Sequence, residues 1–316
     1  MKRLKYIIIT IIFIVFIINL DIVISSTKDA TILFFNKLFV TIFPFIILSD
    51  ILIYYDYHIF LNKIFGKTIS KLFNIDKNTT IVFILSILTS QPCNSLYIKD
   101  LLDKKIIDIN TANKLLCFTY FPSISFVIGT IGLTIFNSFK IGLLLYFLTL
   151  LNNILIGLFL RKDKSNQLEK VNIIKDNNLF IILKKSILKA FNTLSIILGN
   201  LIFFTIILNI INKYTKINII LKSIIYSTIE ITNAINIIST INNIHLKFIL
   251  TLFSLTISSL SILFQSFSIL SDYNINKKRI IITKLLFSLL FILLLALIYF
   301  LIEVTSSFNT ITFIIK

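Results

Sequence analysis

The amino-acid sequence predicts an all-α polytopic membrane protein with two inverted repeats, each containing a re-entrant helical hairpin and a broken helix. Three observations lead to this prediction. Of the 316 residues, 57% are hydrophobic and the mean hydropathy is +0.96, which is more apolar material than a soluble domain can bury. Apolar runs of about 20 residues recur, each long enough to cross a hydrocarbon core of about 30 Å. Polar residues interrupt these runs at corresponding places in the two halves of the chain.

The first apolar run begins "MKRLKYIIITIIFIVFIINL", a basic start followed by an apolar stretch. A cleaved signal peptide is one interpretation, but the stretch is long and no small-residue cleavage site follows in "DIVISSTKDA". We therefore predict an uncleaved signal-anchor helix in residues 1–30, crossing the membrane over residues 6–24.

The first repeat is predicted over residues 31–160. It contains crossings over 32–55, 115–137 and 140–160, and a re-entrant hairpin over 79–99. Unpaired backbone groups are costly in lipid, so a helix break survives there only where protein or water covers it.

The hairpin tip is predicted where Pro92 removes a backbone donor and ends the helix of "TTIVFILSIL". Polar side chains beside the proline offer donors and acceptors to a substrate. The alternative is a loop that is merely packed between helices. The predicted tip residues are Gln91, Pro92, Cys93, Asn94 and Ser95.

A second break is predicted at "FPSIS", within the crossing over 115–137. Proline is favoured in the first turn of a helix, so Pro122 can begin a new half-helix. Its N-terminus would direct backbone N–H groups and a positive dipole end inward, beside Ser123 and Ser125. This arrangement favours an anion, particularly a carboxylate. An ordinary proline kink is the alternative.

A polar linker over residues 161–178 precedes the second repeat, which is predicted over residues 179–303 and followed by a tail over 304–316. The second repeat has crossings over 186–212, 248–271 and 280–303, and a re-entrant hairpin over 224–243.

The two repeats share the spacing of their polar breaks: 31 residues separate Gln91 from Pro122, and 31 separate Glu230 from Ser261. With the N-terminus inside, the first hairpin enters from the inner side and the second from the outer side. The repeats are then inverted, as in many secondary transporters, whose sites form where broken helices meet near the midplane.

Glu230, in "IIYSTIEITNAINII", is the carboxylate that we expect deepest in an apolar region. An intramembrane acid is a functional candidate that can bind a proton or cation, or accept a hydrogen bond from a substrate. Thr232 and Asn233 lie nearby. The alternative is that Glu230 lies at a helix end and reaches the interface. Asp50 is a weaker candidate because it falls near the end of its run.

The second polar break of this repeat is "SLSILFQSFSILSD", where Ser261, Gln265 and Ser268 are spaced by four and three residues. This spacing predicts that they share one face of a helix. Gln265 is the strongest of the three, because an amide in lipid needs partners.

The formal net charge of +17 raises the alternative of a nucleic-acid-binding protein. With the N-terminus cytoplasmic, however, most lysines and arginines fall in predicted inside loops, among which we count Lys114, Lys189 and Lys284. This is the positive-inside bias of membrane proteins, and anionic lipid adds to it. We expect the lipid bilayer, not nucleic acid, as the partner.

No enzyme motif occurs in the sequence: GxSxG, HExxH and the P-loop are absent. Cys93 and Cys117 form no disulfide framework and have no metal-ligating neighbours in the sequence. We expect no catalytic residue, cofactor or metal site.

From about residue 30 to 303 the chain resembles the YlbJ-type sporulation integral membrane proteins, which have two nucleoside-recognition (gate) domains. The segments that carry the resemblance are "LFVTIFPFIILSDIL", "SQPCNSLYIKDLLDKKIIDINTANKLLCFTYFPSISFVIGTIG", "LLNNILIGL", "EITNAI" and "SILFQSFSILSD". The chain departs from the family pattern at four positions: Ser90 and Asn94 replace glycines, Cys93 replaces a serine and Phe121 replaces an asparagine.

The resemblance implies a multi-pass transporter that moves a small anion, dipicolinic acid, across the outer forespore membrane of a spore-forming bacterium. Paired hairpins would hold the substrate, as in the concentrative nucleoside transporters that gate-domain proteins resemble. The alternatives are a membrane scaffold for spore-envelope or cortex assembly and a nucleoside-type transporter. A homo-oligomer is left open.

Overall fold

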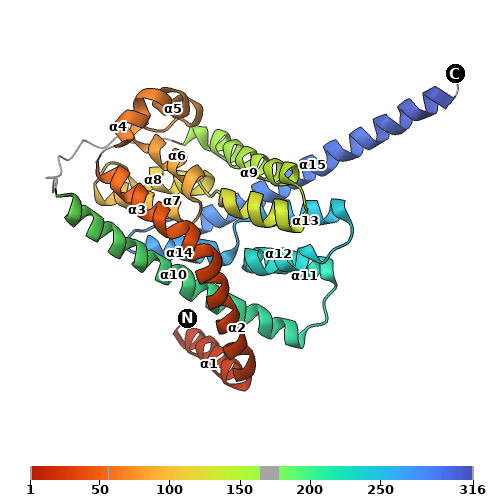
Figure 1. Cartoon of the computed structure of the whole chain (residues 1–316), viewed down its shortest axis with the longest axis horizontal. Helices are drawn as coiled ribbons and strands as arrows, with labels where there is room; N and C mark the ends of the chain where they lie inside the picture. The colour runs from red at the N-terminus through yellow and green to blue at the C-terminus, as the bar shows by residue number, and fades with distance from the viewer. Residues whose placement is uncertain (1, 56, 164–177, 315–316) are drawn as a thin grey trace.

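The computed structural model describes residues 2–55, 57–163 and 178–314 (Figure 1). These residues form helices joined by short turns and contain no β-strand. The predicted all-α architecture is therefore confirmed. Most of the predicted linker over 161–178 lies outside the described residues.

The N-terminal run is divided into α1 (Lys2–Ile18) and α2 (Leu20–Leu33), which meet at an angle of 89°. Asn19 occupies the bend, and its side-chain oxygen accepts hydrogen bonds from Lys213 Nζ at 3.1 Å and Tyr214 Oη at 2.9 Å. The predicted crossing over 6–24 is therefore not one straight helix, because Asn19 is held by the end of a distant helix.

The first half of the chain continues through short helices into a hairpin, a broken helix and a long helix. Its elements are η1 (Phe34–Phe39), α3 (Val40–Tyr54), α4 (Tyr57–Leu61), η2 (Asn62–Gly66), α5 (Lys67–Phe73), η3 (Lys77–Thr79), α6 (Thr80–Thr89), α7 (Cys93–Asp103), α8 (Ile109–Phe118), η4 (Ser125–Ile135), α9 (Phe139–Phe159) and η5 (Leu160–Lys162). Of these, η1 and η4 are wide π-type helices.

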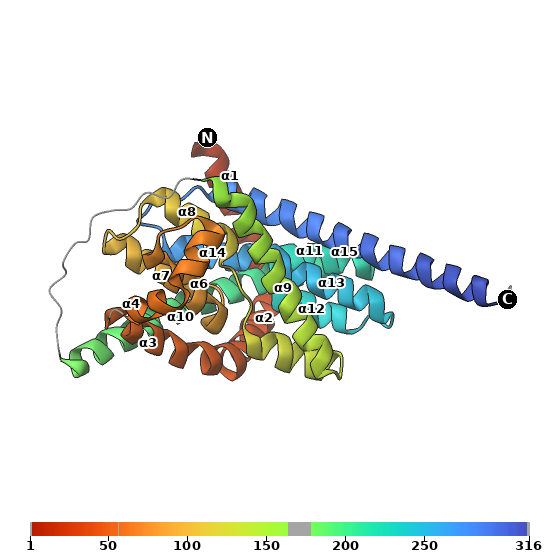
Figure 2. The same ribbon diagram turned by 90° about the horizontal axis from the view of Figure 1, so that it is seen from above.

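The second half has a similar order: a long helix, two short helices packed on each other, a broken helix and a long helix. Its elements are α10 (Leu179–Tyr214), α11 (Ile219–Ile229), α12 (Ile231–Ser239), α13 (Ile244–Ile257), α14 (Leu260–Ile269) and α15 (Lys277–Ile314). Helix α10 packs along α2, α3 and α14, and the far end of α15 projects from the helical body in both views (Figure 2).

Within the described residues, four helices are long and apolar enough to cross a membrane, and six if each of two bent pairs is one span. The protein is therefore of the multi-pass type. Among the described residues, these four to six candidate spans are fewer than the seven crossings that the sequence predicted. Residues 115–137 contain the end of α8, a connection at "FPSIS", where the break was predicted, and η4; residues 6–55 are divided between α1 and the α2–η1–α3 series. The broken span over Ile244–Ile269 is the most enclosed, with 72% of its apolar stretch buried, compared with 22% for Lys277–Leu297.

Candidate functional site

Three polar helix breaks meet at one cavity of about 280 Å³, and α14, which follows a fourth break, contributes Gln265 to it. The lining comes from η1, the α6–α7 turn, the connection before η4, α10, the α11–α12 junction and α14. The polar residues that line it are Asn36, Ser90, Gln91, Ser123, Ser125, Thr130, Glu230, Thr232 and Gln265, accompanied by Pro92, Pro122 and apolar side chains.

The turn between α6 and α7 forms the first wall. Proline ends α6, and the Gln91–Pro92 peptide bond is cis. The backbone N–H of Gln91 donates to the carbonyl of Phe121 at 2.9 Å, which joins the two breaks of the first half. Ser90 has φ 75° and ψ 169°, a region that glycine adopts at the lowest cost.

The connection before η4 forms the second wall. Asn153 of α9 donates from Nδ2 to the carbonyl of Tyr120 at 2.7 Å and so fixes the connection. Ser123 Oγ accepts from the backbone N–H of Phe126 at 3.2 Å and lies 2.7 Å from Ser125 Oγ. The start of the half-helix is therefore capped by Ser123, and Pro122 precedes the helix instead of occupying its first turn.

Glu230 lies at the junction of α11 and α12, where its extended backbone ends one helix and caps the next. Its Oε1 accepts from Thr232 Oγ1 at 2.5 Å. Its Oε2 accepts from the backbone N–H of Asn233 at 2.8 Å and from Asn233 Nδ2 at 2.9 Å. The residue is only 3% exposed and lines the cavity. A capping carboxylate therefore faces the cavity.

Gln265 of α14 also lines the cavity. Its Nε2 donates to Ser261 Oγ at 3.3 Å, one turn earlier on the same helix. Ser258, in the break before α14, has a left-handed φ of 56°. The break turns α14 so that Gln265, but not Ser261, reaches the cavity.

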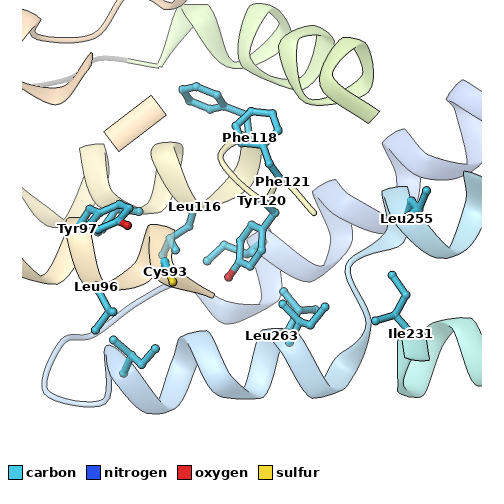
Figure 3. Packing of buried hydrophobic residues seen from close by; sticks show 14 of the residues in the cluster. Cys93, Leu96, Tyr97, Leu116, Phe118, Tyr120, Phe121, Ile231, Leu255 and Leu263 are labelled. Carbon is cyan, nitrogen blue, oxygen red and sulfur yellow. The ribbon is translucent and has the colours of Figure 1, made fainter. Parts of the chain in front are cut away.

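Six predicted site residues lie elsewhere. Cys93, Asn94 and Ser95 face the protein interior because the first turn of α7 packs against the core, where Figure 3 shows Cys93 among apolar side chains. Ser261 and Asn233 do not line the cavity but bond to residues that do. Ser268 is exposed and donates to the carbonyl of Phe264 on its own helix. The prediction that Cys93 lies on an exposed tip is therefore wrong.

Several lining residues carried no signal in the sequence. Asn36 and Thr130 lie in the π-type helices η1 and η4. Helices of this type are rare in proteins and often occur at functional sites. Ile197 and Leu201 of α10 close the cavity with apolar surface. Among the described side chains, Glu230 is the one charged group in the lining.

The three lysines that we placed in loops lie in helices. Lys114 donates to the carbonyls of Asn74 and Asp163, each at 3.0 Å. Lys189 of α10 pairs with Asp50 of α3 at 2.5 Å and with Asp100 of α7 at 2.6 Å.

Lys284 of α15 is 1% exposed; it donates to Asn153 Oδ1 at 2.7 Å and lies 5.0 Å from the ring centre of Tyr120. The placement of these lysines in loops was therefore wrong. They lie in helices, where partners distant in the sequence contact their side chains.

Comparisons of the chain with protein-family models, with curated proteins and with solved structures found no match.

Proposed function

We propose that this chain is a secondary transporter of a small polar solute, and that its substrate is the dipicolinate dianion. The observation that supports the proposal most directly is that three polar helix breaks, from both halves of the chain, meet at one cavity together with Gln265 of the helix that follows a fourth break. Such breaks are costly in a membrane unless they serve a cavity. The resemblance to YlbJ-type sporulation proteins supplies the substrate and the site of action, the outer forespore membrane, with the N-terminus in the cytoplasm.

The order of elements supports the further proposal that the two halves are inverted repeats. In both halves a pair of short helices is followed by a broken helix and then a long helix, although the first half has additional short helices before the pair. Rocking of one repeat against the other would expose the shared cavity alternately to each side.

The size and lining of the cavity favour a compact ring compound. A volume of about 280 Å³ is at the lower end of the roughly 300–1,000 Å³ typical of ligand pockets. Hydroxyl and amide groups of Ser123, Ser125, Gln91 and Gln265 can bind carboxylates without an arginine. The side-chain oxygen of Gln91 is buried and accepts no hydrogen bond from the described residues. It is an acceptor, so the amide nitrogen of Gln91 would be the group that contacts a carboxylate.

Glu230 favours a second candidate, a neutral solute rich in hydrogen-bond donors, such as a nucleoside. An ionised carboxylate only accepts hydrogen bonds, so it favours ligands that carry hydroxyl or amino groups. Competition by unlabelled nucleosides separates this candidate from dipicolinate transport.

The proposal is tested by uptake of labelled dipicolinate into proteoliposomes. Gln265→Ala removes a lining amide, and loss of a hydrogen bond to a charged ligand raises the half-saturating concentration by about tenfold or more. Gln91→Ala should act in the same direction. Ser268→Ala, one turn from Gln265 on the exposed side of α14, is the matched control and should leave uptake unchanged.

Folded protein, judged by a single symmetric peak in gel filtration, is required for each variant. Wild-type uptake no greater than that of empty vesicles would refute transport of dipicolinate and favour a scaffold.

A further inference from the structure

We propose that Glu230 takes up a proton when an anionic substrate enters the cavity, so that the transporter is a proton–anion symporter. This inference rests on the proposed function. The observation behind it is the charge of the cavity: its one described charged side chain has the same sign as the proposed substrate.

The lining leaves an entering anion without a compensating cation. Beside Glu230, the polar lining residues are amides and hydroxyls, which are neutral. An ionised carboxylate and a dianion in a space of about 280 Å³ repel each other at close range, and burial strengthens the repulsion. Protonation of Glu230 removes one of the like charges and replaces it with a hydrogen-bond donor.

The described ionisable groups on the surrounding elements supply no cation to the cavity that would offset the charges of Glu230 and the anion. Tyr226 of α11 donates to the carbonyl of Leu208, and Lys222 lies over the ring of Tyr226. Lys213 of α10 bonds to Asn19 near Asp21.

Lys189 of α10 pairs with Asp50 of α3 and Asp100 of α7, and other ionisable groups lie at helix starts. His245 and Lys247 are in the first turn of α13, Cys93 is buried in the core at the start of α7, and the side chain of Lys37 in η1 is outside those described. No described lysine or arginine forms an ion pair with Glu230, and none lines the cavity.

The hydrogen bonds of Glu230 determine which oxygen takes the proton. Oε2 accepts from two N–H groups of Asn233, which can only donate, so a proton on Oε2 would displace them. Oε1 accepts only from the hydroxyl of Thr232. A hydroxyl can rotate and accept instead, so Oε1 can become an O–H donor while α12 keeps its cap.

The transport step then balances in mass and moves one net negative charge across the membrane in each cycle. A proton from the side of entry binds Oε1, the dianion binds the neutral cavity, and after reorientation both leave on the other side. No bond other than O–H forms or breaks. The net movement is one proton with each dianion, so a pH gradient drives accumulation when the membrane potential is clamped.

The experiment uses proteoliposomes containing the full chain, labelled dipicolinate and a trapped fluorescent pH indicator. Wild-type vesicles should accumulate dipicolinate under an inwardly directed proton gradient and acidify when external dipicolinate is added. Glu230→Gln keeps the shape and the cap acceptor but cannot be ionised. It should lose gradient-driven accumulation and dipicolinate-dependent acidification while still exchanging internal for external dipicolinate.

Equilibrium binding gives an independent readout. If binding takes up one proton, wild-type affinity for dipicolinate should fall as the pH rises, by up to about tenfold per pH unit, whereas Glu230→Gln should bind with little pH dependence. Asp29→Asn, an exposed carboxylate of α2, is the control and should behave like wild type.

Two outcomes overturn the inference. One is wild-type transport that moves no protons and ignores the gradient, which would leave the proposed function intact. The other is a Glu230→Gln variant whose accumulation depends on the gradient as in wild type. If wild type neither binds nor moves dipicolinate under any gradient, the proposed function fails and the inference fails with it.

Discussion

Asn153 connects a buried lysine to the backbone of a helix break. Its Oδ1 accepts from Lys284 Nζ at 2.7 Å and its Nδ2 donates to the carbonyl of Tyr120 at 2.7 Å. Asn153→Leu would leave the ammonium without its acceptor and the carbonyl without its donor, which costs about 3–5 kcal/mol. Lys284→Met removes the charge itself and leaves one amide oxygen unpaired, a cost of about 1–3 kcal/mol.

The two substitutions should be strongly coupled. The double variant is expected to lose less free energy of unfolding than the sum of the single losses, because the charge stranded by Asn153→Leu is absent from it. Reversible unfolding in detergent measures the cycle. Asn200→Leu is the control, since that amide donates within its own helix to Ile196. Additive effects of the pair would show that the contact does not stabilise the break.

At the scale of elements, η4 and α9 approach each other through two glycines. A Cβ added to Gly132 would lie 2.6 Å from the Cα of Gly142, closer than packed atoms allow. Small residues at such crossings let membrane helices pack closely. Gly132→Ala should therefore separate the helices and cost about 1–3 kcal/mol, and it should lower uptake because Ser125 and Thr130 of η4 line the cavity.

Gly129, on the same helix, is the matched control. A Cβ added there meets no atom within 4 Å. Gly129→Ala should leave the unfolding temperature in detergent unchanged or slightly higher, since alanine loses less conformational entropy than glycine. An equal loss of stability in both variants would rule out the close approach as the cause.

At the scale of the whole molecule, the sequence predicted the helical class and located the polar breaks better than it predicted their contacts. Gln91, Ser123 and Glu230 were identifiable because polar groups in an apolar run need cover. The structure places these three at one cavity. Nothing in the sequence indicated that Ile197 lines the cavity, because it is one isoleucine among the many apolar residues of its run. The bend at Asn19 depends on a residue 194 positions away and was equally hidden.

The partners of Lys189 could not be predicted either, because they are distant in the sequence. The contacts of Lys189 join three parts of the chain. Lys189 of α10 pairs with Asp50 of α3 and Asp100 of α7, which are 139 and 89 positions away. Helix α7 follows the α6–α7 turn that lines the cavity, so this ion-pair network holds one wall of the site to the second half of the molecule. Lys189→Met should leave two carboxylates close together without their shared cation, at a cost of about 3–5 kcal/mol.

The measurements for Lys189→Met are unfolding temperature in detergent and dipicolinate uptake, both of which should fall. Adding Asp50→Asn and Asp100→Asn should restore much of the stability, because the stranded charges are then removed. Lys184→Met, on an exposed face of the same helix, is the control and should resemble wild type. If the triple variant regains stability but not uptake, the network acts in the transport cycle as well as in folding, since it ties α7 to α10 across the two halves. If Lys189→Met and Lys184→Met are alike, the network contributes to neither.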